Sequence, residues 1–88
     1  KEIAQYVLYH HERFDGSGYP IGLMQEEIPL ISRIISVADA YDAMTNQRTY
    51  KRILNKEEAV NELLKNKGTQ FDPNIVDIFI KKVLKCYL

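Results

Sequence analysis

The two histidines of this chain, His10 and His11, are adjacent in the stretch HHERFDGSGYP, which covers residues 10–20. Histidine is the commonest metal ligand in proteins and titrates near neutral pH. Two adjacent histidines at a helix end can both reach one cavity. They can also reach two metal ions a few ångströms apart, as dinuclear hydrolytic sites require. A lone histidine on an apolar face is more often a hydrogen-bonded core residue, so the pair needs further ligands to indicate a metal site.

Two aspartates supply the oxygen ligands that the histidines lack. On a helix expected to begin at Pro29, Asp42 falls inside the apolar arc and Asp39 on its edge, where an unpaired carboxylate is costly. Carboxylate and imidazole together suit iron, manganese or zinc, so Asp39 is predicted as a metal ligand. Asp42 is predicted to orient a ligand histidine. The alternatives are a core salt bridge of Asp39, for instance to Arg33 or Arg48, and a capping or ion-pair role for Asp42.

A short basic segment after this helix contains Arg48, Lys51 and Arg52. Arginine binds phosphate oxygens through two hydrogen bonds, and lysine adds a point charge. The segment therefore favours a phosphoryl substrate, with a solvated basic face as the alternative.

The loop behind the histidines is rich in glycine and contains Tyr19 and Pro20. Either these residues only shape a turn around a packed tyrosine, or they line a substrate mouth in which Tyr19 stacks on a nucleobase. We interpret the carboxylates of Glu12 and Asp15 as groups that order the loop. A general acid–base pair is the alternative interpretation.

About four helices are expected to position these groups, and no segment is typical of a strand. The first carries the histidines in its last turn, because apolar residues before them recur at helical spacing. The second begins at Pro29 and is broadly apolar. Asn55 and Glu58 form a capping box for the third, and Asp72 and Pro73 begin the fourth.

Composition narrows the class of protein. The 12 basic and 12 acidic side chains cancel and are interspersed, which argues against binding of DNA or RNA polymers. The single cysteine, Cys86, excludes an internal disulfide and favours a reducing cytoplasm. No apolar run approaches the roughly 18 residues of a membrane span, and no signal peptide is recognisable. Because the chain starts at Lys1 inside an expected helix, we expect it to be cut from a larger protein.

Taken together, the motifs and their spacing resemble the HD-GYP family over about residues 1 to 84. They are His10-His11-Glu12, Asp15-Gly16, Gly18-Tyr19-Pro20, Gly22-Leu23, Ile28-Pro29-Leu30, Val37-Ala38-Asp39, Asp42-Ala43, Thr45, Arg48, Tyr50 and Gly68-Thr69-Gln70-Phe71-Asp72-Pro73. The resemblance implies an all-α fold, the C-terminal half of an HD-type helical bundle. It also implies a metal-dependent phosphohydrolase that hydrolyses the bacterial second messenger cyclic di-GMP.

The resemblance assigns roles by position. His10, His11 and Asp39 match ligands of a site for two or three divalent metal ions, iron or manganese. Arg48 and Lys51 match residues that contact the substrate phosphates. The triplet Gly18, Tyr19 and Pro20, which names the family, is assigned to substrate binding. In this family a metal-bridging hydroxide attacks phosphorus, so no catalytic residue is expected beyond the metal ligands.

The family's earlier ligands, including a His-Asp dyad, lie upstream of the matched stretch and have no counterpart in these residues. We therefore expect residues 1–88 to be a partial HD-GYP domain that is inactive by itself. An alternative is a non-catalytic regulatory module that binds cyclic di-GMP, or a signalling protein partner, through the Gly-Tyr-Pro loop. Core surface exposed by truncation would in addition favour an oligomer.

Overall fold

The computed structural model describes residues 2–47 and 52–86, and within these ranges the chain is helical. The elements are α1 (Glu2–Leu8), the 3₁₀ turn η1 (Tyr9–His11), the 3₁₀ turn η2 (Gln25–Glu27), α2 (Leu30–Thr45), α3 (Lys56–Lys65), α4 (Pro73–Ile78) and the wider π turn η3 (Phe79–Val83). The described part of the chain forms no strand and has no helix long and apolar enough to cross a membrane. The predicted all-α fold with four main helices is confirmed.

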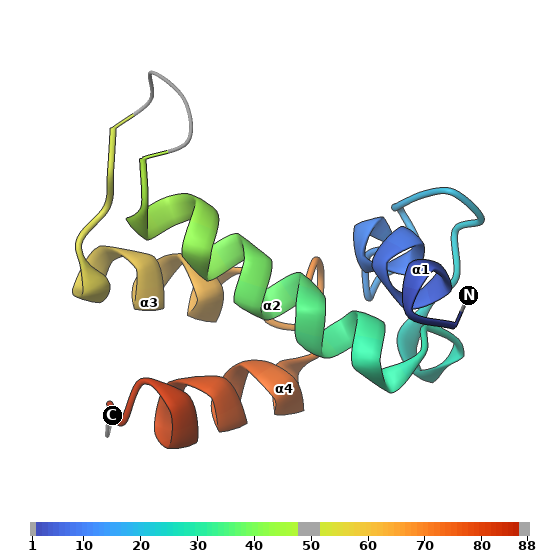
Figure 1. The fold of residues 1–88 in the computed structure, drawn as a ribbon. Coiled ribbons are helices and arrows are strands. Elements are labelled where there is room, and N and C mark those ends of the chain that lie inside the picture. Colours follow the sequence, from blue (N-terminus) through green and yellow to red (C-terminus); the bar gives the residue numbers. More distant parts are fainter. Residues whose placement is uncertain (1, 48–51, 87–88) are drawn as a thin grey trace.

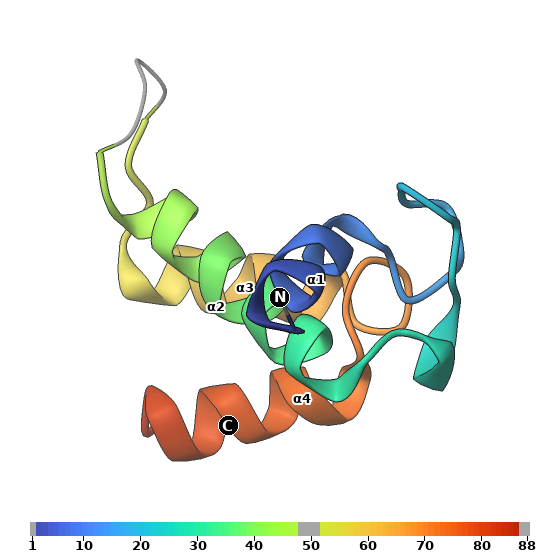
Figure 2. The ribbon, with the colours of Figure 1, turned by 45° about the vertical axis from the view of Figure 1, so that its right-hand side comes forward.

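Helix α2 is the centre of the fold (Figures 1 and 2). Its C-terminal half packs against α3, and its N-terminal half contacts α1. Helix α4 also contacts α2, and Figure 1 shows it below α2, on the same side as α3. Val37, in the middle of α2, is fully buried. The buried side chains that form the core with it are Val60, Leu63, Phe71, Val76 and Ile80. Because α2 is anchored by this core, it is a rigid support for the acidic side chains on its other faces.

The helix ends follow the predicted caps closely. Pro29 is the N-cap of α2, so the helix begins one residue later than expected. In α3 the backbone N–H of Glu58 donates to Asn55 Oδ1 (2.8 Å), and the backbone N–H of Asn55 donates to Glu58 Oε1 (3.0 Å), which confirms the capping box. Asp72 caps α4 by accepting two backbone N–H groups of its first turn.

A buried ion pair links α2 to the start of α4. Arg33 Nη1 donates to Asp72 Oδ2 at 2.7 Å, and Arg33 Nε donates to the carbonyl oxygen of Ile28 at 2.9 Å. Asp72 is buried, so its charge depends on this arginine and on the helix N–H groups for compensation. Arg33 thus pairs with Asp72 and not with Asp39, the partner considered above.

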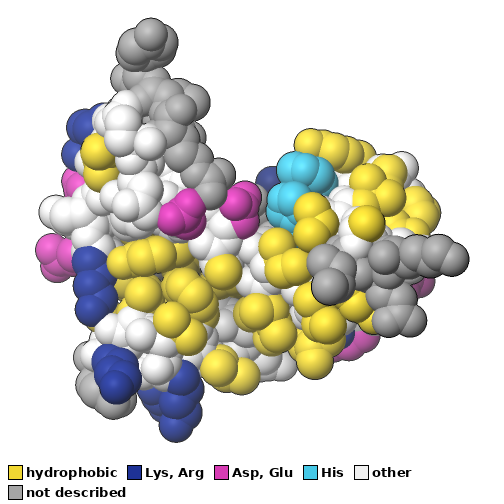
Figure 3. Space-filling model, in the orientation of Figure 1, with side chains coloured by type: hydrophobic (Ala, Val, Ile, Leu, Met, Phe, Trp, Pro, Cys, Tyr) yellow, Lys and Arg dark blue, Asp and Glu magenta, His cyan; other side chains and the backbone are white. Residues whose placement is uncertain are grey.

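One face of the molecule is apolar and exposed (Figure 3). Among the described residues, the exposed large hydrophobic side chains include Val7 and Leu8 on α1 and Ile31 and Ile34 on α2, each about half exposed. Apolar side chains of α1 and α2 are thus partly exposed in the described part of the chain. Larger contiguous patches of this kind mark association sites.

Candidate metal and substrate site

A pocket of about 340 Å³ opens between η1, the loop that follows it and the middle of α2. The space-filling view shows histidine side chains on one side of a hollow and acidic side chains across it (Figure 3). His10, His11 and Asp39 all line the pocket. The fold thus brings together the three residues that the sequence predicts as metal ligands, although Asp39 is on a different helix.

His10 faces Asp39 across this pocket. Its Nε2 lies 3.9 Å from Asp39 Oδ2, and its Nδ1–H donates to the carbonyl oxygen of Val7. Because a carbonyl oxygen can only accept, Nδ1 is the donor of this bond, and Nε2 is the ring nitrogen that faces the pocket. The side chain of Asp39 is 43% exposed, so its carboxylate is accessible from solvent.

His11 lies between two other rings. Its ring centroid is 4.0 Å from that of His10, and it stacks on Tyr19 at 4.9 Å with an interplanar angle of 15°. Tyr19 remains 62% exposed. The Gly-Tyr-Pro loop therefore touches a predicted metal ligand directly, and much of the tyrosine surface is free to meet a ligand.

Two imidazoles and a carboxylate around one pocket are a donor set that suits iron, manganese or zinc. Within residues 2–47 and 52–86, however, no three histidine, cysteine, aspartate or glutamate side chains converge as a complete metal-binding group. Protein metal sites usually have four or more ligands, of which at least three come from the protein in catalytic zinc sites. The donor types present suit a metal ion, but the described residues alone do not form a group that could hold one.

The other predicted site residues are placed differently. Asp42 does not line the pocket; its Oδ1 accepts a hydrogen bond from the side-chain amide of Asn46 at 2.7 Å. Arg48 and Lys51 lie outside the described residues. The roles of these three residues stay predictions.

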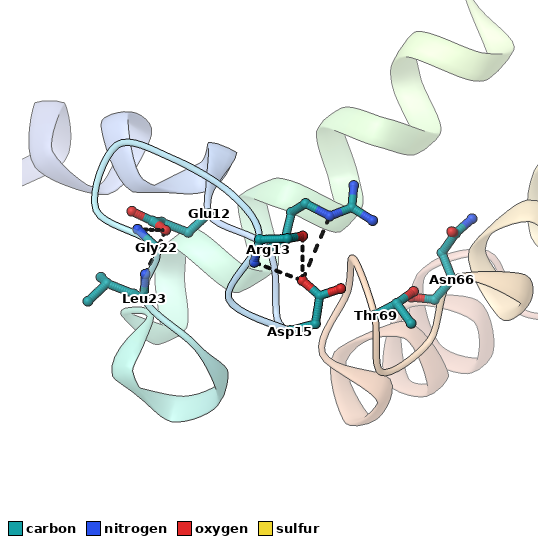
Figure 4. A network of polar contacts seen from close by, with 8 residues as sticks. Glu12, Arg13, Asp15, Gly22, Leu23, Asn66 and Thr69 are labelled. Carbon is teal, nitrogen blue, oxygen red and sulfur yellow. Dashed lines mark hydrogen bonds and ion pairs between the residues drawn. The ribbon is translucent and has the colours of Figure 1, made fainter.

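Glu12 orders the loop behind the histidines from a buried position, with 3% of its surface exposed. Its Oε2 accepts the backbone N–H of Ile21 at 2.7 Å, and its Oε1 accepts those of Gly22 and Leu23, both at 2.8 Å. Figure 4 shows the carboxylate beside the last two. The interpretation of Glu12 as a loop-ordering residue is confirmed, and these contacts occupy the oxygens that acid–base chemistry would use.

The start of the loop is held from two further directions. Asp15 Oδ1 accepts hydrogen bonds from the Oγ (2.6 Å) and the backbone N–H (3.0 Å) of Ser17, and these bonds lower the pKa of the Asp15 carboxyl. The backbone N–H groups of Phe14 and Asp15 donate to the carbonyl oxygens of Gln70 (3.1 Å) and Thr69 (2.8 Å). The segment before α4 therefore supports the histidine loop.

Four other polar pocket residues were not predicted as site residues from the sequence: Arg13, Ser17, Ser36 and Gln70. Arg13 and Ser17 lie inside the histidine motif, and Ser36 lies one turn before Asp39 on α2, so proximity in sequence was a usable signal for them. Gln70 comes from the segment before α4, and only the tertiary structure brings it here.

Gly18 is required by a close approach of backbone to backbone. A Cβ atom at this position would lie 2.4 Å from the backbone nitrogen of Arg13 and 2.5 Å from the carbonyl oxygen of His11. Gly18→Ala is therefore expected to lower the free energy of unfolding by about 1–3 kcal/mol, the usual cost of overpacking. Urea denaturation of the variant measures this loss.

Gly68→Ala is the matched control for Gly18→Ala. The φ of Gly68, +83°, is unfavourable for alanine, but a Cβ at this position would meet nothing within 4 Å. We expect the control to lose about 1 kcal/mol from backbone conformation alone. A loss below about 0.5 kcal/mol in Gly18→Ala would contradict the steric argument.

An all-α domain with this pocket belongs to a class that includes known phosphodiesterases. The structure is similar to the crystal structure of a cyclic GMP-AMP-specific phosphodiesterase of Vibrio cholerae, with a TM-score of 0.77 and 29% sequence identity, over 94% of this chain and 18% of that chain. Residues 1–75 match the family model described as HD domain. The chain belongs to the HD domain family.

Two curated relatives cover most of this chain. It is 46% identical over 80 residues to a probable cyclic di-GMP phosphodiesterase of Vibrio cholerae serotype O1, which is 91% of this chain and 18% of that protein. It is also 46% identical over 78 residues to a cyclic di-GMP phosphodiesterase of Thermotoga maritima, 89% of this chain and 21% of that protein. The chain thus spans about a fifth of the length of these relatives.

Proposed function

We propose that this chain contributes part of the active site of a metal-dependent cyclic di-GMP phosphodiesterase of the HD-GYP type. The observation that carries the proposal is that His10, His11 and Asp39 all line one pocket, with Tyr19 stacked on His11. The names of the HD-domain relatives support a cyclic dinucleotide as the substrate.

The residues of this chain would act mainly by holding and positioning. His10 and His11 would offer imidazole nitrogens and Asp39 a carboxylate oxygen to two or three divalent ions, iron or manganese. When bound, such ions polarise phosphoryl oxygens and make water more nucleophilic. Glu12 keeps the loop closed behind the histidines, so Tyr19 stays at the pocket mouth, where a guanine base of the substrate would stack.

We further propose that residues 1–88 form part of an HD-GYP domain whose remaining ligands, including the His-Asp dyad, lie outside them. The incomplete set of ligands at the pocket supports this division. On this proposal the 88-residue segment by itself is inactive.

The test uses the natural protein that contains these residues, at its full length. We expect it to linearise cyclic di-GMP in the presence of Mn²⁺ or Fe²⁺. Dialysis against a chelator should abolish turnover, and either ion should restore it, because the proposed ligands need a metal to act on the phosphodiester. Product formation followed by chromatography measures both steps.

The same experiment separates the enzyme from a regulatory module. Binding of cyclic di-GMP with no linear product, under any metal tested, would contradict the proposal and favour a non-catalytic binding module. Turnover that persists unchanged after removal of metal would also contradict it.

A further inference from the structure

Arg13 provides the one lysine or arginine side chain among the described residues that line the pocket. The other charged groups in the lining are the carboxylates of Glu12 and Asp39. With neutral histidines, the described lining therefore carries one positive and two negative charges. A cyclic dinucleotide has two negatively charged phosphodiester groups. A cationic side chain in the pocket lining therefore contributes more to the binding free energy than one on an open surface.

Within the described residues, the guanidinium of Arg13 forms one ion pair, a long one to Asp15. Its Nε lies 3.9 Å from Asp15 Oδ1, beyond hydrogen-bond distance, and that oxygen already accepts two hydrogen bonds from Ser17. The side chain of Arg13 has no other hydrogen bond or ion pair within the described part of the chain, so its two terminal nitrogens have no acceptor there. Figure 4 shows this end of the side chain extending away from Asp15.

The backbone that carries Arg13 is held on both sides. Glu12 is buried and bonded to the far end of the loop, and the N–H groups of Phe14 and Asp15 donate to residues 70 and 69. Gly18 packs against the backbone nitrogen of Arg13. A guanidinium carried by a backbone segment held in this way loses less conformational freedom on binding a ligand than one carried by a loose loop.

We propose that Arg13 is a phosphate-binding residue of this pocket, which donates to a phosphoryl oxygen of the cyclic dinucleotide. The inference rests on the proposed function and adds a substrate contact to it. Arginine matches phosphate because its planar fork donates two parallel hydrogen bonds and keeps its charge at all physiological pH values. The side chain is 37% exposed, so the substrate can reach it without displacing the fold.

Arg13→Gln in the full-length natural protein tests this role. Loss of a charge-assisted hydrogen bond should raise the KM for cyclic di-GMP roughly 10- to 100-fold, while kcat changes less. Arg13→Lys restores the charge without the fork and should give an intermediate KM. The KM of the wild type should also rise more steeply with salt than that of Arg13→Gln, because one ionic contact is lost.

Asp15→Asn is the matched control, since asparagine keeps an oxygen that can accept from Ser17 and removes only the charge beside Arg13. If Arg13 acted merely by pairing with Asp15, this variant would reproduce the KM of Arg13→Gln; we expect a KM within about twofold of wild type, as for an exposed ion pair. Thermal unfolding and equilibrium binding of cyclic di-GMP accompany the kinetics, and Arg13→Lys decides the question if Arg13→Gln does not fold.

The outcomes are distinguishable from those for the proposed function. Suppose that the wild type shows metal-dependent turnover and that its KM equals those of Arg13→Lys and of any folded Arg13→Gln. This result overturns the role of Arg13 and leaves the phosphodiesterase proposal intact. An Asp15→Asn variant that matches Arg13→Gln also overturns it. A wild type with no metal-dependent turnover contradicts the proposed function itself, and equal binding of cyclic di-GMP by wild type and variants then rejects Arg13 as well.

Discussion

Glu12→Gln is expected to lower the free energy of unfolding by about 3 kcal/mol or more, because it breaks a buried group of charge-assisted hydrogen bonds. The carboxylate accepts three backbone N–H groups from Ile21, Gly22 and Leu23. A carboxamide has one oxygen, and its NH₂ group would face at least one of these donors. A buried N–H left without an acceptor carries the full cost of desolvation.

The substitution should also weaken the proposed metal site. The loop that Glu12 holds presents Tyr19 to His11, so a released loop removes the stacked ring from one predicted ligand. We therefore expect the variant to bind Mn²⁺ more weakly than wild type, in addition to a lower midpoint in urea. Denaturation followed by circular dichroism and metal titration by calorimetry measure the two effects.

Glu27→Gln is the matched control for Glu12→Gln. Glu27 is exposed, and its Oε1 accepts a single backbone N–H, that of Met24, at 3.0 Å. An exposed substitution of this kind should cost no more than about 0.5 kcal/mol. Equal losses in the two variants would show that the buried carboxylate has no special part in holding the loop.

His11→Ala is expected to reduce hydrolysis of cyclic di-GMP by at least about a hundredfold in the full-length natural protein, since loss of even an outer partner of a metal ligand costs 10–100-fold. The substitution removes an imidazole from the pocket and the surface on which Tyr19 stacks. Metal content, measured on the purified variant, should fall together with turnover.

Gln5→Ala is a suitable control for His11→Ala because Gln5 is exposed on α1 and does not line the pocket. We expect it to keep wild-type turnover and metal content. Unchanged hydrolysis by a folded His11→Ala protein would contradict the assignment of His11 as a ligand, and with it the phosphodiesterase site proposed for this pocket.

Much of the fold was predictable from the sequence because helix signals are local. The capping box of Asn55 and Glu58 and the Asp72 cap act within a few residues, so their residue types and spacing already specify where α3 and α4 begin. The turn η2 and the π turn η3 were not predicted. Each is only a few residues long, and hydrophobic spacing does not resolve elements of that length.

By itself the sequence determined which groups are available for chemistry: an adjacent histidine pair, a glycine-rich loop and two aspartates on one apolar helix. The tertiary structure decided which of them meet. It directs His10 to Asp39 and leaves Asp42 with Asn46, and it brings Gln70 beside the histidines. Such contacts depend on how α2 packs against the core and on where distant backbone groups find their hydrogen-bond partners, and neither is encoded in local spacing.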